Sequence, residues 1–124
     1  MGKVQSVKNK FVSIMGDWVN SYLPDATGNS PKTVESYQKA CELLLDYMYI
    51  VAKIPADKLQ FKDLDYEVIM DFLGWLKKEK KYSDGSLNVR LAALRSFAKY
   101  AQNKDFKAAS VFYSAVNKVP VKKK

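Results

Sequence analysis

Two groups of basic and polar side chains in this sequence stand at helical spacing and have the chemistry to bind nucleic acid. The first group is Lys32, Thr33, Ser36 and Lys39, and the second is Ser86, Asn88, Arg90, Arg95 and Lys99. Lysine and arginine neutralise phosphates, whereas asparagine and arginine can also bond to base edges. These residues are therefore candidates for a DNA-binding surface. The periodicity alone fits two ordinary solvated helix faces at least as well.

The residue types that most enzyme sites need are missing. The 124 residues include no histidine and a single cysteine, Cys41. The sequence therefore excludes Ser-His-Asp and Cys-His machinery and any disulfide within one chain. It also shows no metal-ligand cluster, no phosphate-binding glycine loop and no obvious acid–base pair of carboxylates. We expect no cofactor, no metal site and no enzyme activity in this chain.

The net charge of +8 is concentrated in the second half of the chain. Residues 1–60 contain seven Lys and six Asp or Glu, whereas residues 61–124 contain fourteen Lys or Arg and seven Asp or Glu. Such an excess attracts polyanions, of which nucleic acid is the commonest. No run of 18 apolar residues is present, and Asp17 interrupts the short apolar run near the N-terminus. We expect a cytoplasmic protein with no membrane partner.

Five helical segments are predicted to position the polar groups, near residues 8–23, 30–53, 65–81, 83–103 and 106–117. Ser30, Asp65 and Ser83 are the expected N-caps, and Pro31 suits a first helical position. Leu23-Pro24 is expected to end the first helix. The lysines of residues 77–81 have a structural explanation, because cations favour the negative end of a helix dipole.

The apolar residues of each segment recur at steps of three and four and predict the core. They are Phe11, Met15, Trp18, Val19 and Tyr22 in the first segment, and Val34, Tyr37, Cys41, Leu44, Met48 and Val51 in the second. The third contributes Val68, Ile69, Phe72, Leu73 and Leu76, and the fourth Leu87, Leu91, Leu94, Phe97, Ala98 and Ala101. The fifth contributes Val111, Phe112, Ala115 and Val116. This pattern predicts an all-α fold.

Two stretches resemble a known family. They are Ser-Pro-Lys-Thr-Val-Glu-Ser-Tyr at residues 30–37, followed by Leu44 and Leu45, and Tyr-Ser-Asp-Gly-Ser-Leu-Asn-Val-Arg-Leu-Ala-Ala-Leu-Arg-Ser-Phe at residues 82–97. In this order and at this separation they are similar to the N-terminal core-binding, SAM-like domain of the tyrosine recombinases, the phage integrase family. The resemblance extends over residues 10–120. It implies a compact bundle of four to five helices.

The resemblance also implies a function. In the family, this domain and a C-terminal catalytic domain clamp duplex DNA from opposite sides, and the second and fourth helices face the DNA. The matching positions at that surface are Lys32, Thr33, Ser36, Asn88, Arg90 and Arg95, whereas Tyr37, Leu44, Leu91, Leu94 and Phe97 match core positions. Val89 and Ser86 depart from the pattern, where a basic residue and threonine are usual. Helical geometry also places Arg90 near the core stripe, so an acidic partner is an alternative to DNA.

The family's catalytic domain uses arginines, a histidine and a tyrosine nucleophile. The sequence lacks histidine, so we expect that domain to be absent from this chain, and Tyr113 is not expected to be a nucleophile. The expected partners are double-stranded DNA, the catalytic domain of a parent protein and other recombinase protomers. The expected organisation is a flexible segment at 1–9, the binding domain at 10–117 and a basic linker at 118–124. The alternative is a protein-interaction module that presents Trp18 or Tyr113 to a neighbour.

Overall fold

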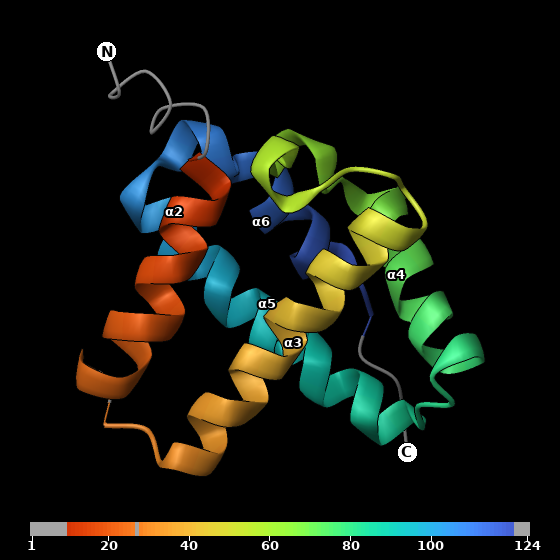
Figure 1. The fold of residues 1–124 in the computed structure, drawn as a ribbon, viewed down its shortest axis with the longest axis horizontal. Coiled ribbons are helices and arrows are strands. Elements are labelled where there is room, and N and C mark those ends of the chain that lie inside the picture. The colour runs from red at the N-terminus through yellow and green to blue at the C-terminus, as the bar shows by residue number, and fades with distance from the viewer. Residues whose placement is uncertain (1–9, 27, 121–124) are drawn as a thin grey trace. The chain divides into compact units, whose positions relative to one another are not determined.

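The computed structural model describes residues 10–26 and 28–120, and these residues form helices and no strand (Figure 1). The all-α fold predicted from the sequence is therefore confirmed. The chain divides into an N-terminal unit that ends at Gln60 and a C-terminal unit that begins at Phe61. Within the described residues, no helix is both long and apolar enough to cross a lipid bilayer.

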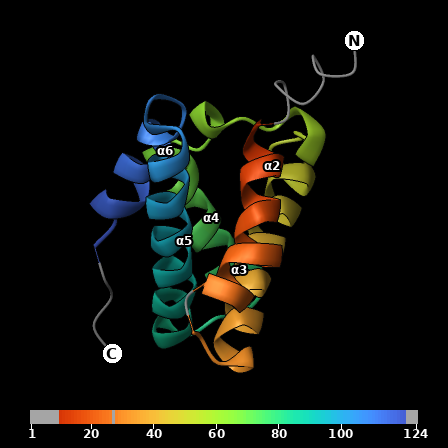
Figure 2. The same ribbon diagram turned by 90° about the vertical axis from the view of Figure 1, so that its left-hand side faces the viewer.

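The N-terminal unit contains α2 (Lys10–Asp17), the π-helix η1 (Trp18–Ala26), α3 (Pro31–Ile50) and the short 3₁₀ turn η2 (Ala56–Lys58). Helix η1 continues α2 and packs along α3 (Figure 2). At this contact the rings of Trp18 and Tyr37 stack with centroids 5.6 Å apart and planes 13° apart. Trp18 is fully buried, so the prediction that it is presented to a neighbouring protein is wrong.

The π-helical winding of η1 changes which residues reach the core. An α-helix places Tyr22 beneath Trp18, four residues on, and the sequence pattern predicted Tyr22 to be inward. A π-helix bonds residues five apart, so Leu23 takes that place instead. Leu23 is 1% exposed and Tyr22 is 40% exposed. The inward prediction for Tyr22 is therefore wrong because it assumed an α-helical period.

The first helical segment also extends past its predicted end at Leu23. Pro24 lies inside η1 and cannot donate the backbone N–H that a π-helix would direct to the carbonyl of Val19. That carbonyl instead accepts a hydrogen bond from Nε2 of Gln38 on α3, at 3.4 Å. The side chain of Gln38 therefore replaces the missing donor and joins η1 to α3.

Helix α3 begins where its cap chemistry predicts and ends earlier than its apolar pattern predicts. Oγ of Ser30 accepts the Thr33 N–H at 3.2 Å, and Pro31 is the first helical residue. The helix ends at Ile50, three residues before the predicted end, and Val51 is exposed and not in the core. The N–H of Ile54 bonds to the Met48 carbonyl at 2.9 Å, and Lys53 between them has φ 63°.

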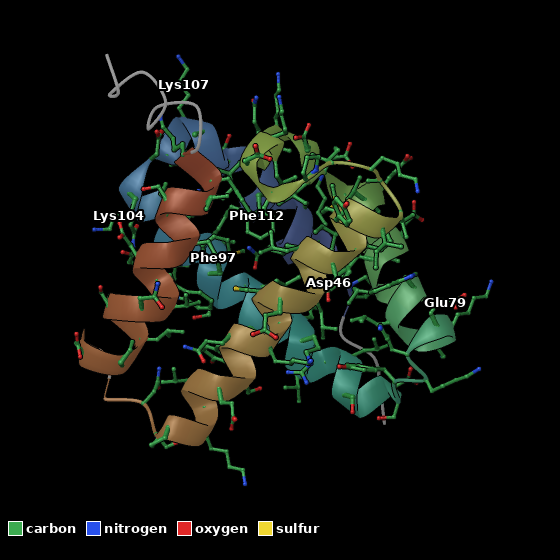
Figure 3. The ribbon with its side chains drawn as sticks, in the orientation of Figure 1. Asp46, Glu79, Phe97, Lys104, Lys107 and Phe112 are labelled. Carbon is green, nitrogen blue, oxygen red and sulfur yellow. The ribbon has the colours of Figure 1, made fainter. Side chains whose placement is uncertain are left out.

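The C-terminal unit contains the 3₁₀ turn η3 (Phe61–Asp63), α4 (Tyr66–Glu79), α5 (Asp84–Lys104) and α6 (Phe106–Lys118). Helix α6 packs against α5, α4 and η3. Phe61, Phe97 and Phe112 meet with ring centroids 5.6–6.1 Å apart, and Figure 3 labels the last two. This aromatic cluster joins η3, α5 and α6.

Three side-chain caps set the starts of the helices in this unit. Asp65 accepts the Val68 N–H at 3.0 Å and Ser83 accepts the Ser86 N–H at 3.1 Å, which confirms both predicted caps. Asp105, which the sequence pattern did not single out, accepts the Ala108 N–H at 3.1 Å and starts α6. Each carboxylate or hydroxyl satisfies a backbone donor that the first helical turn leaves open.

Every predicted core residue of α5 is buried, whereas one prediction on α6 is wrong. Val111 is 42% exposed, although it was predicted to face inward. The buried residues of α6 are Ala109, Phe112, Ala115 and Val116. Val111 lies about 110° around the helix from the centre of this set, at 100° per residue. Ala109 marks the true inward face, and its small size hid that signal in the sequence.

The predicted terminal segments are only partly within the described residues. Residues 1–9 and 121–124 lie outside them. Of the predicted linker at 118–124, Lys118 is the last residue of α6 and Val119 is 4% exposed. Residues 118 and 119 are therefore part of the C-terminal unit.

Candidate nucleic-acid interface

The predicted contact residues of α3 lie over its first two and a half turns. Lys32, Ser36 and Lys39 follow one another at steps of four and three, so they share one side of the helix. Lys32 and Lys39 are exposed, and Ser36 and Thr33 are half-buried. The Thr33 hydroxyl oxygen accepts a hydrogen bond from the Ser30 hydroxyl at 3.1 Å. This side of α3 presents two cationic groups to solvent near the positive end of the helix dipole.

An open groove lies beside the start of α3. Pro24 of η1 and Pro31, Lys32, Glu35 and Gln38 of α3 line it. Lys32 is cationic and Glu35 is anionic, so the charge of the groove is mixed. The cationic character of this helix therefore comes from the row of Lys32 and Lys39 and not from the groove.

The predicted contact residues of α5 fall on two different sides of that helix. Asn88, Arg95 and Lys99 share one side with Ala92, at steps of four, three and four. Ser86 and Arg90 are four residues apart on another side, so the fold does not bring all five residues together. Ser86, Ala92 and Lys99 are exposed, and Asn88, Arg90 and Arg95 are half-buried. Because Ala92 is exposed and small, the middle of the side that carries Asn88, Arg95 and Lys99 has no protruding side chain.

Arg95 makes hydrogen bonds within the protein that the sequence pattern did not foresee. Its Nε donates to the Val116 carbonyl at 3.0 Å, and its Nη2 donates to the Val119 carbonyl at 2.6 Å. Both carbonyls lie at the C-terminal end of α6, where helical carbonyls have no partner inside the helix. Arg95 therefore caps α6 from α5. Its assignment to DNA stays a prediction.

Arg90 lies over an aromatic ring. Its guanidinium carbon is 5.6 Å from the centroid of the Tyr82 ring, an arrangement that a cation and an aromatic face favour. This contact joins the start of α5 to the segment that follows α4. The sequence left open an acidic partner or DNA for Arg90, and the structure adds Tyr82 as a partner.

An apolar cavity of about 190 Å³ lies next to Asn88 between α4 and α5. Leu73 of α4, Leu87 and Leu91 of α5, and the chain segment at Val119 also line it. The amide of Asn88 therefore stands at the edge of an apolar hollow. Val119 and Pro120, at the end of the described residues, line the same cavity as Asn88, whose amide has the groups to bond to a base edge.

The lysines of the last turn of α4 and of the residues that follow it were not among the predicted contact residues. Lys77, Lys78, Lys80 and Lys81 are all exposed there. Nζ of Lys77 pairs with Asp84 at 3.3 Å, and Nζ of Lys80 lies 5.2 Å from the centroid of the Trp75 ring. The sequence analysis noted these lysines but attributed them to the helix dipole, which favours cations at a helix C-terminus, and did not propose a ligand for them.

The single cysteine, Cys41, has low reactivity. Cys41 is buried on α3, and burial, with a smaller effect from Glu42, raises the pKa of its thiol from an ordinary 9.0 to about 12. A thiol with this pKa is protonated at neutral pH and is a poor nucleophile or metal ligand. In the described ranges, no three side chains of the metal-binding types come together.

Comparison with known proteins identifies the family. A family model described as phage integrase, N-terminal SAM-like domain, matches residues 19–105, which contain both α3 and α5. The protein named "Putative integrase/recombinase y4rC" from Sinorhizobium fredii is 35% identical over 72 residues. That match covers 58% of this chain and 22% of the relative, so it spans about a fifth of the relative's length. No solved structure matches the chain significantly. Because the family model covers most of the sequence, the chain belongs to the phage integrase N-terminal SAM-like domain family.

Proposed function

We propose that this chain binds double-stranded DNA as the core-binding part of a tyrosine-type site-specific recombinase. The outward sides of α3 and α5 contact the duplex, and a catalytic domain of the parent protein encloses it from the opposite side. The observation that carries this proposal is the exposure of Lys32, Lys39 and Lys99 on helices whose opposite sides form the core. In a chain with net charge +8, such rows are suited to neutralise phosphates.

The residues divide by the contact that each can make. Lys32, Lys39 and Lys99 contribute phosphate contacts, because they are exposed and cationic. Thr33, Ser36 and Ser86 contribute neutral hydrogen bonds to the backbone of the DNA. Asn88 is the best candidate for reading a base, since its amide can both donate and accept. Arg90 and Arg95 are half-buried, and their guanidinium groups contribute positive potential beside these contacts.

The chain contributes binding and not strand cleavage. The family's cleavage chemistry, as the resemblance implies, uses histidine and a tyrosine nucleophile, and this sequence has no histidine. Tyr113 is half-buried on α6, and its carbonyl accepts a hydrogen bond from the Asn117 amide at 2.8 Å. No histidine stands beside it to act as a general base. We therefore assign Tyr113 no catalytic role.

The experiment is a measurement of DNA affinity against salt concentration. A labelled duplex of random sequence is titrated with the protein at several salt concentrations between about 50 and 200 mM, and fluorescence anisotropy reports binding. Each phosphate contact contributes about 0.9 to the slope of log affinity against log salt. The double variant Lys32→Gln/Lys39→Gln is expected to lower the slope by about 1.8.

A matched control separates a local contact from net charge. Lys53→Gln/Lys58→Gln removes two exposed charges from the same unit, beyond the other end of α3. Eighteen helical residues, about 27 Å, separate Lys32 from that end of α3. The control is expected to keep the slope of the unmodified protein. Absence of binding at the lowest salt would reject the proposed function, and equal losses in the two double variants would reject the assignment to α3.

A second function, as a protein-interaction module, is favoured by one surface feature. Tyr49, Ile50 and Val51 are 64%, 53% and 46% exposed and follow one another at the end of α3. Consecutive exposed apolar residues are typical of a contact with another protein. Mass measured against concentration in the absence of DNA tests this candidate. A monomer at every concentration, together with salt-dependent DNA binding, would favour the DNA-binding proposal alone.

A further inference from the structure

The last turn of α4 and the residues that follow it contain the densest group of positive charges among the described residues. Lys77, Lys78, Lys80 and Lys81 occupy four of five consecutive positions and are all exposed. Glu79 and Asp84 are the acidic residues of the same stretch, so cations outnumber anions by two to one. We call these four lysines the lysine turn. Figure 3 labels Glu79 in this turn, at the other end of the unit from Lys104 and Lys107.

Two of the four lysines are engaged within the protein. Lys77 pairs with Asp84, and Lys80 lies over the Trp75 ring. Lys78 and Lys81 form no ion pair with any residue that the structure describes. Their charges are therefore open to an anion from outside.

The position of Lys81 is not explained by the fold. The N–H of Tyr82 bonds to the Leu76 carbonyl, six residues back, at 3.1 Å, and the N–H of Lys80 bonds to the same carbonyl at 3.1 Å, which closes the end of α4. Lys81, at φ 60°, occupies the left-handed position of this closure, where glycine is favoured and a side chain costs free energy. The helix dipole favours a cation anywhere near this end of α4, so it does not explain why a lysine occupies the left-handed position itself.

We propose that the lysine turn is a further phosphate-binding surface for duplex DNA, with Lys78 and Lys81 as its main contacts. This inference rests on the proposed function and extends it to a segment outside the helix rows described above. Duplex DNA carries about one negative charge per 1.7 Å of its length, so several phosphates lie within reach of a turn of this size. Lys77 and Lys80, which the protein already holds, add positive potential beside the two contacts.

The first test compares two double variants of the C-terminal unit in the salt titration. Lys78→Gln/Lys81→Gln is expected to lower the slope by about 1.8, equivalent to two phosphate contacts. The control Lys104→Gln/Lys107→Gln removes two exposed charges, one at the opposite end of α5 and one beyond it, about 30 Å away over the 21 residues of that helix. It is expected to leave the slope unchanged.

The second test uses substitutions that separate binding from folding. Lys81→Gly removes a charge and relieves the left-handed strain, so it is expected to raise the unfolding midpoint while lowering the salt slope by about 0.9. Lys53→Gly is its counterpart, because Lys53 has φ 63° in the same kind of closure at the end of α3. That variant is expected to raise the midpoint and keep the slope. A residue with a purely structural role could not give this opposite pair of effects at position 81.

The outcomes separate this inference from the proposed function. If the unmodified chain fails to bind duplex DNA, both are rejected. If Lys32→Gln/Lys39→Gln lowers the slope and Lys78→Gln/Lys81→Gln does not, the lysine turn is rejected and the proposed function stands. An equal loss in the Lys104→Gln/Lys107→Gln control would show a net-charge effect and would also reject the lysine turn.

Discussion

Replacement of Arg95 by alanine tests a role that only the structure reveals. Two nitrogens of its guanidinium donate to the carbonyls of Val116 and Val119, at 3.0 and 2.6 Å, across 21 and 24 residues of sequence. The substitution removes both donors at once. It leaves the last turn of α6 without its partner and loosens the buried side chain of Val119. We expect the chain to fold and to be clearly less stable.

The magnitude follows from the two bonds. A hydrogen bond from a charged donor contributes about 1.5–3 kcal/mol, and Arg95 is only half-buried, so the lower end of that range applies to each. We expect Arg95→Ala to lower the free energy of unfolding by about 3 kcal/mol. For a domain of this size, that loss corresponds to a fall in the midpoint temperature of roughly 10 °C. Urea and thermal unfolding followed by circular dichroism measure both quantities.

Lys99→Ala is the matched control, because Lys99 lies on the same side of α5, one turn beyond Arg95, and is exposed. A surface substitution of this kind is expected to change stability by less than about 0.5 kcal/mol. Arg95→Lys keeps the charge but loses the planar pair of donors, so an intermediate loss is expected. If Arg95→Ala and Lys99→Ala are equally stable, the capping role of Arg95 is refuted.

Three further predictions concern stability and reactivity. Ser83→Ala removes the cap of α5 and is expected to cost about 1 kcal/mol in urea unfolding, whereas Ser83→Asp retains the cap; equal losses in both would contradict the capping role. Gln38→Ala is expected to cost about 1 kcal/mol by the same assay, because the Val19 carbonyl loses its donor; an unchanged midpoint would show that η1 does not need Gln38. The pKa of Cys41 is raised by burial and then by Glu42, so its contribution to stability is complete below pH 9 and is lost as the pH rises toward 12. Cys41→Ala should therefore lose less stability than the unmodified chain between those pH values, and parallel pH curves would contradict this.

The helix starts could be predicted from sequence because their causes are local. Ser30, Asp65 and Ser83 each accept an N–H three residues on, so the residue type and the following helical pattern are sufficient. The core stripe of α5 is also local in origin, since leucine and phenylalanine at helical steps define one side of a helix. The family resemblance rests on residues 30–45 and 82–97, which contain the caps Ser30 and Ser83 and most of the core stripe of α5.

Other features depend on contacts between distant segments or on unusual winding. Arg95 looked like a surface residue, because nothing near it in sequence indicates that the end of α6 returns to meet it. The apolar period around Trp18 and Tyr22 indicated an α-helix, whereas the chain winds as a π-helix and inserts Leu23. Val111 was predicted to face inward and is exposed, whereas Ala109, which the sequence pattern did not single out, is buried.

The candidate contact residues were named from the sequence, whereas their contacts within the protein needed the structure. Helical geometry already placed Arg90 near the core stripe, and α5 has Ser86 and Arg90 on a different side from Asn88, Arg95 and Lys99. The half-burial of Arg90 and Arg95 comes from contacts with Tyr82 and with the end of α6. The lysine turn needed the structure because only the structure shows that Lys77 and Lys80 have partners within the protein, whereas Lys78 and Lys81 are exposed and form no ion pair with a described residue.

The most direct test of DNA binding is an amide chemical-shift titration of the isotope-labelled chain with a short random-sequence duplex, at low and moderate salt. The proposal predicts shifts that cluster at residues 32–39 and 86–99 and that weaken as salt increases, because phosphate contacts are salt-dependent. Shifts at residues 78–82 are expected in addition if the lysine turn binds DNA. An unchanged spectrum with millimolar duplex at low salt would contradict DNA binding by this chain.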